Sequence, residues 1–302
     1  MLHSMKRFIY KSYRKLKKYY LTNNVRFDTI VFFYLLSIFE KLFSKREVNR
    51  KSSQFDKDQY LKRYGTEPIY LVQSKKKVAL ESHDHLIPRG AILDNSLNYN
   101  FNFKLKNYFK NKSNLKVLDL GCSGGAFVRS FLDNGDLAIG LEGSDISKNF
   151  KLAEWNICIH HLFTADITEP FFIYKISENK NFNSLIKFDC ITAWEVLEHL
   201  PENKLSTFIE NITNHLEEDG IFVASVDMEP DGNPITGAVY HLTCKPKTFW
   251  VDTFAKKNLL ETKKHNFVKQ DYVRGHGLDL RNWDPDEGGG FHLVLQKNSA
   301  TT

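Results

Sequence analysis

The sequence has few cysteines and lacks an apolar run long enough to cross a membrane. Its 302 residues include four cysteines and no C-x-x-C pair, so neither a disulfide framework nor a structural zinc site is indicated. Residues 29–39 form an uncharged run of eleven residues, whereas a spanning helix needs about twenty. No small-residue cleavage site of a signal peptide follows this run. We therefore expect a reducing, cytoplasmic location.

The histidines are not spaced as metal ligands usually are. His83 and His85 flank Asp84, and His160 is followed directly by His161. Further ligands at the spacing of a metal site do not accompany either pair. We therefore expect no metal.

Positive charge is concentrated at the N-terminal end of the chain. Residues 1–51 contain thirteen Lys and Arg against three acidic residues, and the remainder has a net charge of −4. We expect a basic helical arm over 1–51, a connector over 52–79 and a main domain over 80–298. Two interpretations of the arm stay open, namely a helix packed on the domain or on a second subunit, and a peripheral anchor on an anionic membrane.

The main domain alternates between apolar strands and helical segments, which predicts a parallel sheet covered on both faces. The expected strands are 115–120, 137–142, 163–166, 188–194, 221–226 and 291–296, and the expected helices are 126–134, 203–216 and 248–258. Gly220 follows the second of these helices at the usual stop position.

A glycine-rich turn follows the first expected strand. In residues 117–125, V-L-D-L-G-C-S-G-G, the glycines let a ligand approach bare backbone N–H groups. The next strand ends at Glu142, whose two acceptor oxygens suit the hydroxyls of a ribose. Asp166 ends the third strand, where it can accept a hydrogen bond from an adenine amino group.

Two cofactor classes compete for this layout. A dinucleotide site requires G-x-G-x-x-G, whereas the glycines stand here at 121, 124 and 125. Asp119, two residues before the first glycine, can attract the ammonium of a methionine moiety, which a dinucleotide lacks. The spacing therefore favours S-adenosylmethionine.

Several motifs together resemble the class I S-adenosylmethionine-dependent methyltransferases, in order and in spacing. They are D-L-G-C-S-G-G, G-L-E-G-S-D and F-D-C-I-T-A-W-E-V-L-E-H-L. D-H-L-I-P-R-G-A-I-L-D-N, Y-H-L-T-C-K-P-K-T-F-W and G-G-F-H-L-V-L are similar to segments of a bacterial-type subgroup that acts on small molecules or glycans. The resemblance implies a Rossmann-like three-layer α/β sandwich around a mostly parallel seven-stranded sheet.

The resemblance also implies a set of cofactor contacts. The residues that it places around S-adenosylmethionine are Asp119, Gly121, Cys122, Ser123, Gly125, Glu142, Gly143, Ser144, Asp166, Ile167, Trp194 and Glu195. Ser123 stands where the family usually has its second glycine, and we expect it to narrow the pocket slightly.

Methyl transfer needs a base only when the acceptor is a hydroxyl that must lose its proton. Two histidines after strand ends, His199 and His241, are the candidate bases. A lid with His85, Arg89, Asp94 and Asn95 and the loop 273–290 would shape the acceptor pocket. The polar and aromatic lining predicts O-methylation of a small molecule or of a sugar or glycan acceptor.

Three other function classes stay open at this point. A nicotinamide-dependent oxidoreductase would use the same glycine turn. A methyltransferase fold without activity would serve as a binding subunit, although Asp119, Gly121 and Glu142 are all present. A nucleic-acid methyltransferase would use the basic arm for phosphate contacts, but no N-P-P-Y-like or D-P-P-Y-like segment follows the fourth expected strand.

Overall fold

The computed structural model describes residues 47–85, 94–177, 184–233, 237–273 and 289–298. The chain divides into two compact units, Met1–Arg63 and Tyr64–Thr302. Helix α3, Glu47–Tyr64, is the described part of the first unit. It contains neither glycine nor proline, and Gly65 follows it with φ +74°, the left-handed conformation typical of a helix C-terminus.

The second unit begins before residue 80. Strand β1, Tyr70–Ser74, pairs antiparallel with β5, Phe171–Lys175, which pairs in turn with β6, Ser184–Leu185. The structure therefore places a helix and a strand where the sequence predicted the connector 52–79. The predicted arm lies mostly in residues 1–46, outside the described part of the chain.

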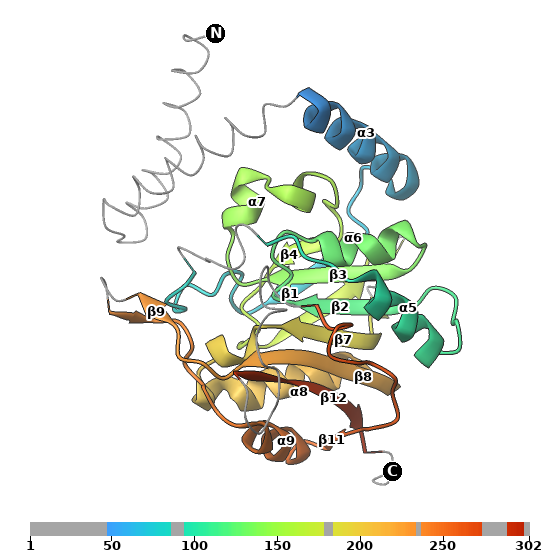
Figure 1. Cartoon of the computed structure of the whole chain (residues 1–302). Coiled ribbons are helices and arrows are strands. Elements are labelled where there is room, and N and C mark those ends of the chain that lie inside the picture. Colours follow the sequence, from blue (N-terminus) through green and yellow to red (C-terminus); the bar gives the residue numbers. More distant parts are fainter. Residues whose placement is uncertain (1–46, 86–93, 178–183, 234–236, 274–288, 299–302) are drawn as a thin grey trace. The chain divides into compact units, whose positions relative to one another are not determined.

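The core of the second unit is a seven-stranded sheet in the order β11-β12-β8-β7-β2-β3-β4, and Figure 1 shows this order from β4 at the top to β11 at the bottom. Its strands are β2, Lys116–Leu120; β3, Leu137–Glu142; β4, Leu162–Thr164; β7, Phe188–Trp194; β8, Leu216–Asp227; β11, Leu259–Glu261; and β12, Gly290–Lys297. The five strands from β8 to β4 are parallel, whereas β12 is antiparallel to β8 and β11 is antiparallel to β12. The predicted Rossmann-like architecture is confirmed.

Helices cover both faces of this sheet because its central strands are apolar on both faces. Helices α8, Leu205–His215, and α9, Lys247–Ala255, contribute Phe208, Trp250 and Phe254 to the core cluster that contains Leu118 and Phe222. Helices α5, Tyr99–Tyr108, and α6, Ala126–Asp133, pack on the opposite face, where Phe101 and Phe127 contact the ring of Trp194. The remaining elements are α7, Ile146–Phe150; η1, Ala153–Asn156; η2, Leu197–His199; η3, Glu202–Lys204; β9, Gly232–Asn233; and β10, Ala238–Val239.

The expectation that Gly220 ends a helix was wrong. Helix α8 ends at His215, and Leu216 is already extended and paired with Phe188 of β7. The next pair joins Cys190 to Ile221, so residues 217–220 form an irregularity within β8. A Cβ on Gly220 would meet the carbonyl oxygen of Asp189 at 2.9 Å. Glycine is therefore required by the close approach of two strands.

The strand order also fixes where a ligand can bind. From β2 the chain continues to β3 and β4 on one side of the sheet and later to β7 and β8 on the other. Ligands of open α/β sheets bind at such a switch point, beside the carboxyl ends of the strands. The carboxyl ends of β2, β3 and β7 are at Leu120, Glu142 and Trp194.

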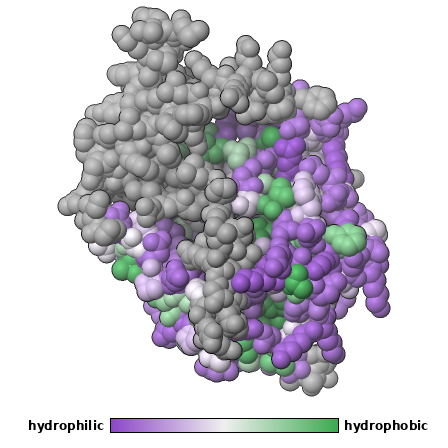
Figure 2. All heavy atoms as spheres, viewed as in Figure 1, coloured by the Kyte–Doolittle hydropathy of each residue, from purple (hydrophilic) through white to green (hydrophobic). Residues whose placement is uncertain are grey.

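Among the described residues, no helix combines the length and apolar character needed to cross a membrane. On the face shown in Figure 2, the coloured surface is mainly hydrophilic, and hydrophobic residues lie on it singly or in small groups. The uncharged run 29–39 lies outside the described residues.

Two adjacent residues of β5, Phe171 and Phe172, test the packing of the three-stranded sheet β1-β5-β6. Phe171 is 1% exposed and stacks on His215, whereas Phe172 on the other face of the strand is 39% exposed. We expect Phe171→Ala to lower the free energy of unfolding by about 3–5 kcal/mol and Phe172→Ala to lower it by less than about 1 kcal/mol. Urea unfolding of both variants measures the difference, and equal losses would contradict this packing of β5.

Candidate functional site

One cavity of about 780 Å³ lies at the carboxyl ends of the parallel strands, within the usual size range of ligand pockets. Every described residue that the sequence predicted by name for the site lines it. The predicted residues on its wall are His85, Asp94, Asn95, Asp119, Gly121, Cys122, Ser123, Gly125, Glu142, Gly143, Ser144, Asp166, Ile167, Trp194, Glu195, His199 and His241. Arg89 and most of the loop 273–290 lie outside the described residues.

The glycine turn after β2 is built from positive φ angles and close contacts. Gly121 has φ +78°, and a Cβ there would lie 2.4 Å from the side chain of Val196. Gly124 donates its N–H to the carbonyl of Asp94 at 3.1 Å. Glycine is therefore required where the turn packs this closely on its neighbours.

Ser123 replaces the family's glycine without losing the backbone geometry. It adopts φ +50°, and its hydroxyl donates to the carbonyl of Asp94 at 2.6 Å. Its own carbonyl accepts a hydrogen bond from the indole of Trp155 at 2.7 Å. The left-handed conformation, which is uncommon for a residue with a side chain, is thus held by contacts on both sides.

Two carboxyl groups are buried where the turn meets the neighbouring strands. Asp119 is 2% exposed and accepts a hydrogen bond from the hydroxyl of Thr192 at 2.7 Å. Glu142 is 7% exposed and accepts from the N–H groups of Ser123 and Ser144 at 2.8 and 3.1 Å. Burial raises the pKa of Asp119 to about 8, because Thr192 offsets only part of the desolvation.

Neither buried carboxyl has a positive partner among the described side chains. Burial also raises the pKa of Glu142, despite the two N–H groups that it accepts from. A carboxylate in such surroundings is stabilised by a ligand that brings a cation or hydroxyl donors. The pair therefore favours a positively charged ligand with hydroxyl groups.

Asp166 is on the cavity wall, but part of its carboxylate serves the local turn. Its Oδ1 accepts from both the N–H and the hydroxyl of Thr168, at 3.0 and 2.6 Å. Strand β4 ends at Thr164, two residues earlier than predicted. Ile167, next to Asp166, adds an apolar side chain that is 8% exposed.

Described residues on both sides of positions 86–93 form another part of the wall, namely Ser82, Asp84, His85, Asp94, Asn95 and Ser96. Asn95 accepts the N–H of Ala126 at 2.9 Å and so caps helix α6 from outside. The carbonyl of His85 accepts the hydroxyl of Ser144 at 2.9 Å, and burial lowers the pKa of the His85 imidazole. Asp94 and Asn95 therefore lie directly on the glycine turn, and His85 lies beside the end of β3.

The segment after β7 brings both candidate histidines together. Glu195 has φ +54°, with its N–H 3.1 Å from the carbonyl of Ser225. The rings of His199 and His241 lie 4.8 Å apart at 86°. Burial lowers the pKa of His199, and the carboxylate of Asp84, 3.2 Å from its Nδ1, opposes this shift.

The sequence interpretation gave no role to one acidic residue of this region, Glu198, and placed Asp84 only at the start of the predicted lid. Glu198 is fully buried and lies with His199 and His241 in one group. Burial raises the pKa of Glu198, and the neighbouring Glu195 adds to the shift. The pattern E-x-x-E-H after β7, with a further histidine at 241, was the available signal.

Comparison with known proteins gives the same family. The profile of a family described as "Methyltransferase domain" matches residues 95–271. A ubiquinone biosynthesis O-methyltransferase of Pelagibacter ubique is 28% identical over 183 residues, which cover 59% of this chain and 71% of the relative. One of Glaesserella parasuis is 29% identical over 152 residues, covering 46% of this chain and 60% of the relative.

Among solved structures, an S-adenosylmethionine-dependent methyltransferase from Clostridium acetobutylicum aligns with 72% of this chain and 96% of its own. The TM-score is 0.44 and the sequence identity is 12%.

The family match covers more than half of the chain, so the chain belongs to the methyltransferase-domain family. It is an S-adenosylmethionine-dependent methyltransferase, as the sequence predicted. The site fits this cofactor, because its wall combines a glycine turn with two buried carboxyl groups that have no cationic partner among the described residues.

The pKa of Asp119 gives a prediction for the protein without cofactor. Between its ordinary value near 4 and about 8, the folded chain holds a proton that the unfolded chain has released, so stability falls as pH rises. Asp119→Asn cannot ionise, and its Oδ1 can still accept from Thr192.

We therefore expect Asp119→Asn to become more stable than the wild type as pH rises from 5 to 8, by up to about 1.4 kcal/mol per pH unit. Urea unfolding of both proteins at several pH values measures this difference, in which the other titrating groups cancel. A difference that is constant with pH would show that Asp119 is not buried in this way.

Proposed function

We propose that this methyltransferase transfers the methyl group to a hydroxyl of a small aromatic acceptor. The observation that carries the proposal is the pair of imidazoles, His199 and His241, in the same cavity as the glycine turn. A hydroxyl needs help in losing its proton before it attacks, whereas an amine or thiol acceptor has less need of such groups. The names of the two relatives also describe O-methyltransferases.

The cofactor-binding residues act by position and charge. Asp119, Gly121 and Ser123 would hold the methionine end, and Glu142 the ribose. Gly143 and Ser144 would lie beside the ribose, and Asp166 and Ile167 beside the adenine. S-adenosylmethionine, when bound, supplies a methyl group on a positively charged sulfur.

The cavity wall is both aromatic and polar. Phe127, Trp194 and Val273 line it together with the two histidines and Asp231. A flat ring that carries a hydroxyl matches this combination. The protein's contribution is to orient that hydroxyl toward the methyl group and to exclude water.

Removal of the Glu142 carboxylate tests the cofactor assignment. Glu142→Ala loses two acceptor oxygens, and hydrogen bonds to a charged group contribute about 1.5–3 kcal/mol each, so the Kd for S-adenosylmethionine should rise at least about 100-fold. Isothermal titration measures it, with Glu261→Ala as the control, because Glu261 pairs with Lys247 away from the cavity. Unchanged affinity in Glu142→Ala would remove the ribose assignment.

The acceptor class is tested by transfer of labelled methyl groups to a panel of catechols, sugars and RNA. We expect product only with the catechols, and a turnover about 100-fold lower in His241→Ala. The Kd for the cofactor should stay within about twofold of the wild type in that variant. Labelled RNA would favour the nucleic-acid alternative. Cofactor binding without transfer to any member of the panel would contradict O-methylation of a small aromatic acceptor.

A further inference from the structure

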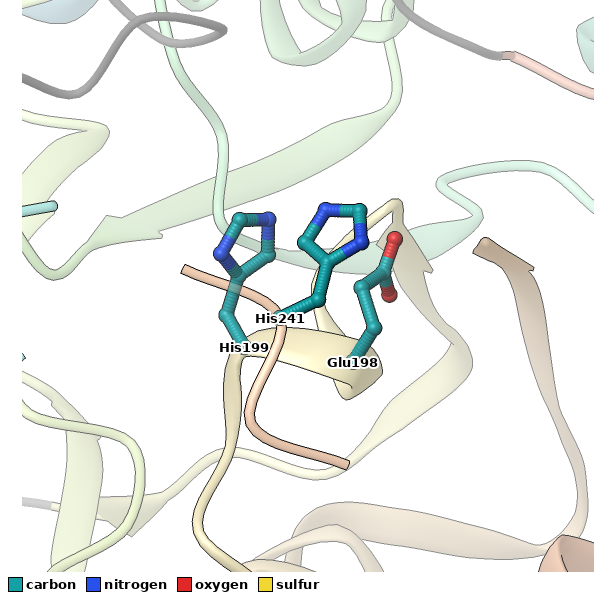
Figure 3. A group of neighbouring side chains, drawn as sticks. All are labelled: Glu198, His199 and His241. Carbon is teal, nitrogen blue, oxygen red and sulfur yellow. The ribbon is translucent and has the colours of Figure 1, made fainter. Parts of the chain in front are cut away.

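Three potential metal ligands converge at the acceptor end of the cavity. Glu198 and His199 come from η2, and His241 comes from the segment after β10. One ligand atom from each residue lies within 4.8 Å of the other two. Figure 3 shows the three side chains extending in the same direction, with the His241 ring between the other two in this view. Binding to one zinc-sized ion, with ligands about 2.0–2.2 Å from it, would require these atoms to move closer together.

One of the two histidines already has a partner on the nitrogen that a metal would leave free. The Nδ1 of His241 lies 2.5 Å from the carbonyl oxygen of Glu229, which can only accept, so this nitrogen carries the proton. Metal-binding histidines usually donate their second N–H to a carbonyl or carboxylate in this manner, and the Nε2 of His241 is thereby left as a ligand. The Nδ1 of His199 lies 3.2 Å from the carboxylate of Asp84 but forms no hydrogen bond with it.

Glu198 provides an independent indication of a cation. Its side chain is fully buried, and its Oε1 accepts from the N–H of Asp227 at 3.1 Å. Its Oε2 is buried and has no hydrogen-bond partner in the structure. A buried carboxylate oxygen without a donor is costly, and a bound cation would remove that cost.

The charge of the surrounding wall also favours a cation. Asp84, Asp227, Glu229 and Asp231 line the same part of the cavity. Lys204 is the one lysine or arginine on the described lining, and it is paired with Glu169 at 2.8 Å. The local field is therefore negative beyond the two carboxyl groups assigned to the cofactor.

We propose that Glu198, His199 and His241 bind a divalent cation of the zinc class. Two imidazoles and one carboxylate, with a position left open, form the ligand set of many catalytic zinc sites. Magnesium prefers an all-oxygen environment, so this donor set selects against it. The site differs from the expectation of no metal, because sequence spacing does not show that residues 198, 199 and 241 converge.

The role of the cation rests on the proposed function. The acceptor hydroxyl occupies the open position, its oxygen binds the cation, and its proton passes to solvent, with nothing oxidised or reduced. A bound cation lowers the pKa of such an oxygen by several units. The histidines then activate the acceptor as ligands rather than by taking the proton themselves.

The test of the site uses the full chain after treatment with a chelator. Titration with Co²⁺ should give visible absorption bands that saturate at one equivalent, and Zn²⁺ should displace them. Glu198→Gln and His241→Ala should weaken binding at least about 100-fold, more than the 10- to 100-fold typical of indirect changes around a metal. His265→Ala is the control, because His265 is not on the cavity wall.

Two further measurements distinguish a loss of metal ligands from a general loss of structure or of cofactor binding. Circular dichroism and the Kd for S-adenosylmethionine should be unchanged in the ligand variants, which excludes misfolding. The absence of saturable Co²⁺ or Zn²⁺ binding, or equal binding by wild type and both variants, would overturn the site. Methyl transfer at an undiminished rate by the chelated enzyme would overturn the role of the cation while leaving O-methylation intact.

Discussion

The structure depends on the cost of keeping carboxyl groups away from water at the carboxyl ends of parallel strands. Asp119 precedes the last residue of β2 and Glu142 ends the neighbouring strand β3, where the sheet geometry buries both almost completely. No cationic side chain of the described residues lies near them, so burial opposes their ionisation. The same place cannot be filled with apolar side chains without losing the site. Burial of these carboxyl groups therefore lowers the stability of the free protein and raises its affinity for a cationic cofactor.

The glycine turn and the segment around Asp94 make this arrangement rigid. Ser123 connects the two, because its N–H binds Glu142 and its hydroxyl binds the Asp94 carbonyl. Asn95 accepts the N–H of Ala126 at the start of helix α6, and this hydrogen bond connects the same segment to the helix that follows the turn. A ligand thus meets groups that are already oriented, which lowers the entropy lost on binding. The serine that replaces the usual glycine is part of that connection.

The end of the cavity proposed for the acceptor has a different chemistry from the end proposed for the cofactor. Here the carboxylate of Glu198 lies beside two imidazoles, and the Asp84 carboxylate lies 3.2 Å from one of them. The two ends share one cavity because β7 is adjacent to β2 at the switch point of the sheet. The transferred group and its acceptor can therefore meet without a large movement of the chain.

The sequence by itself determined the class of fold, the glycine turn and the acids at the strand ends. These features follow from local patterns, since buried strands, tight turns and residues at strand ends are encoded over a few neighbouring positions. It did not determine that Gly220 lies within a strand, because a glycine after a helix looks the same whether it ends the helix or permits close strand contact. Only the tertiary structure decided that Glu198, His199 and His241 meet. Their convergence depends on how the fold places the segment after β7 beside the segment after β10. The sequence pattern does not show that two segments so far apart in the chain are neighbours in space.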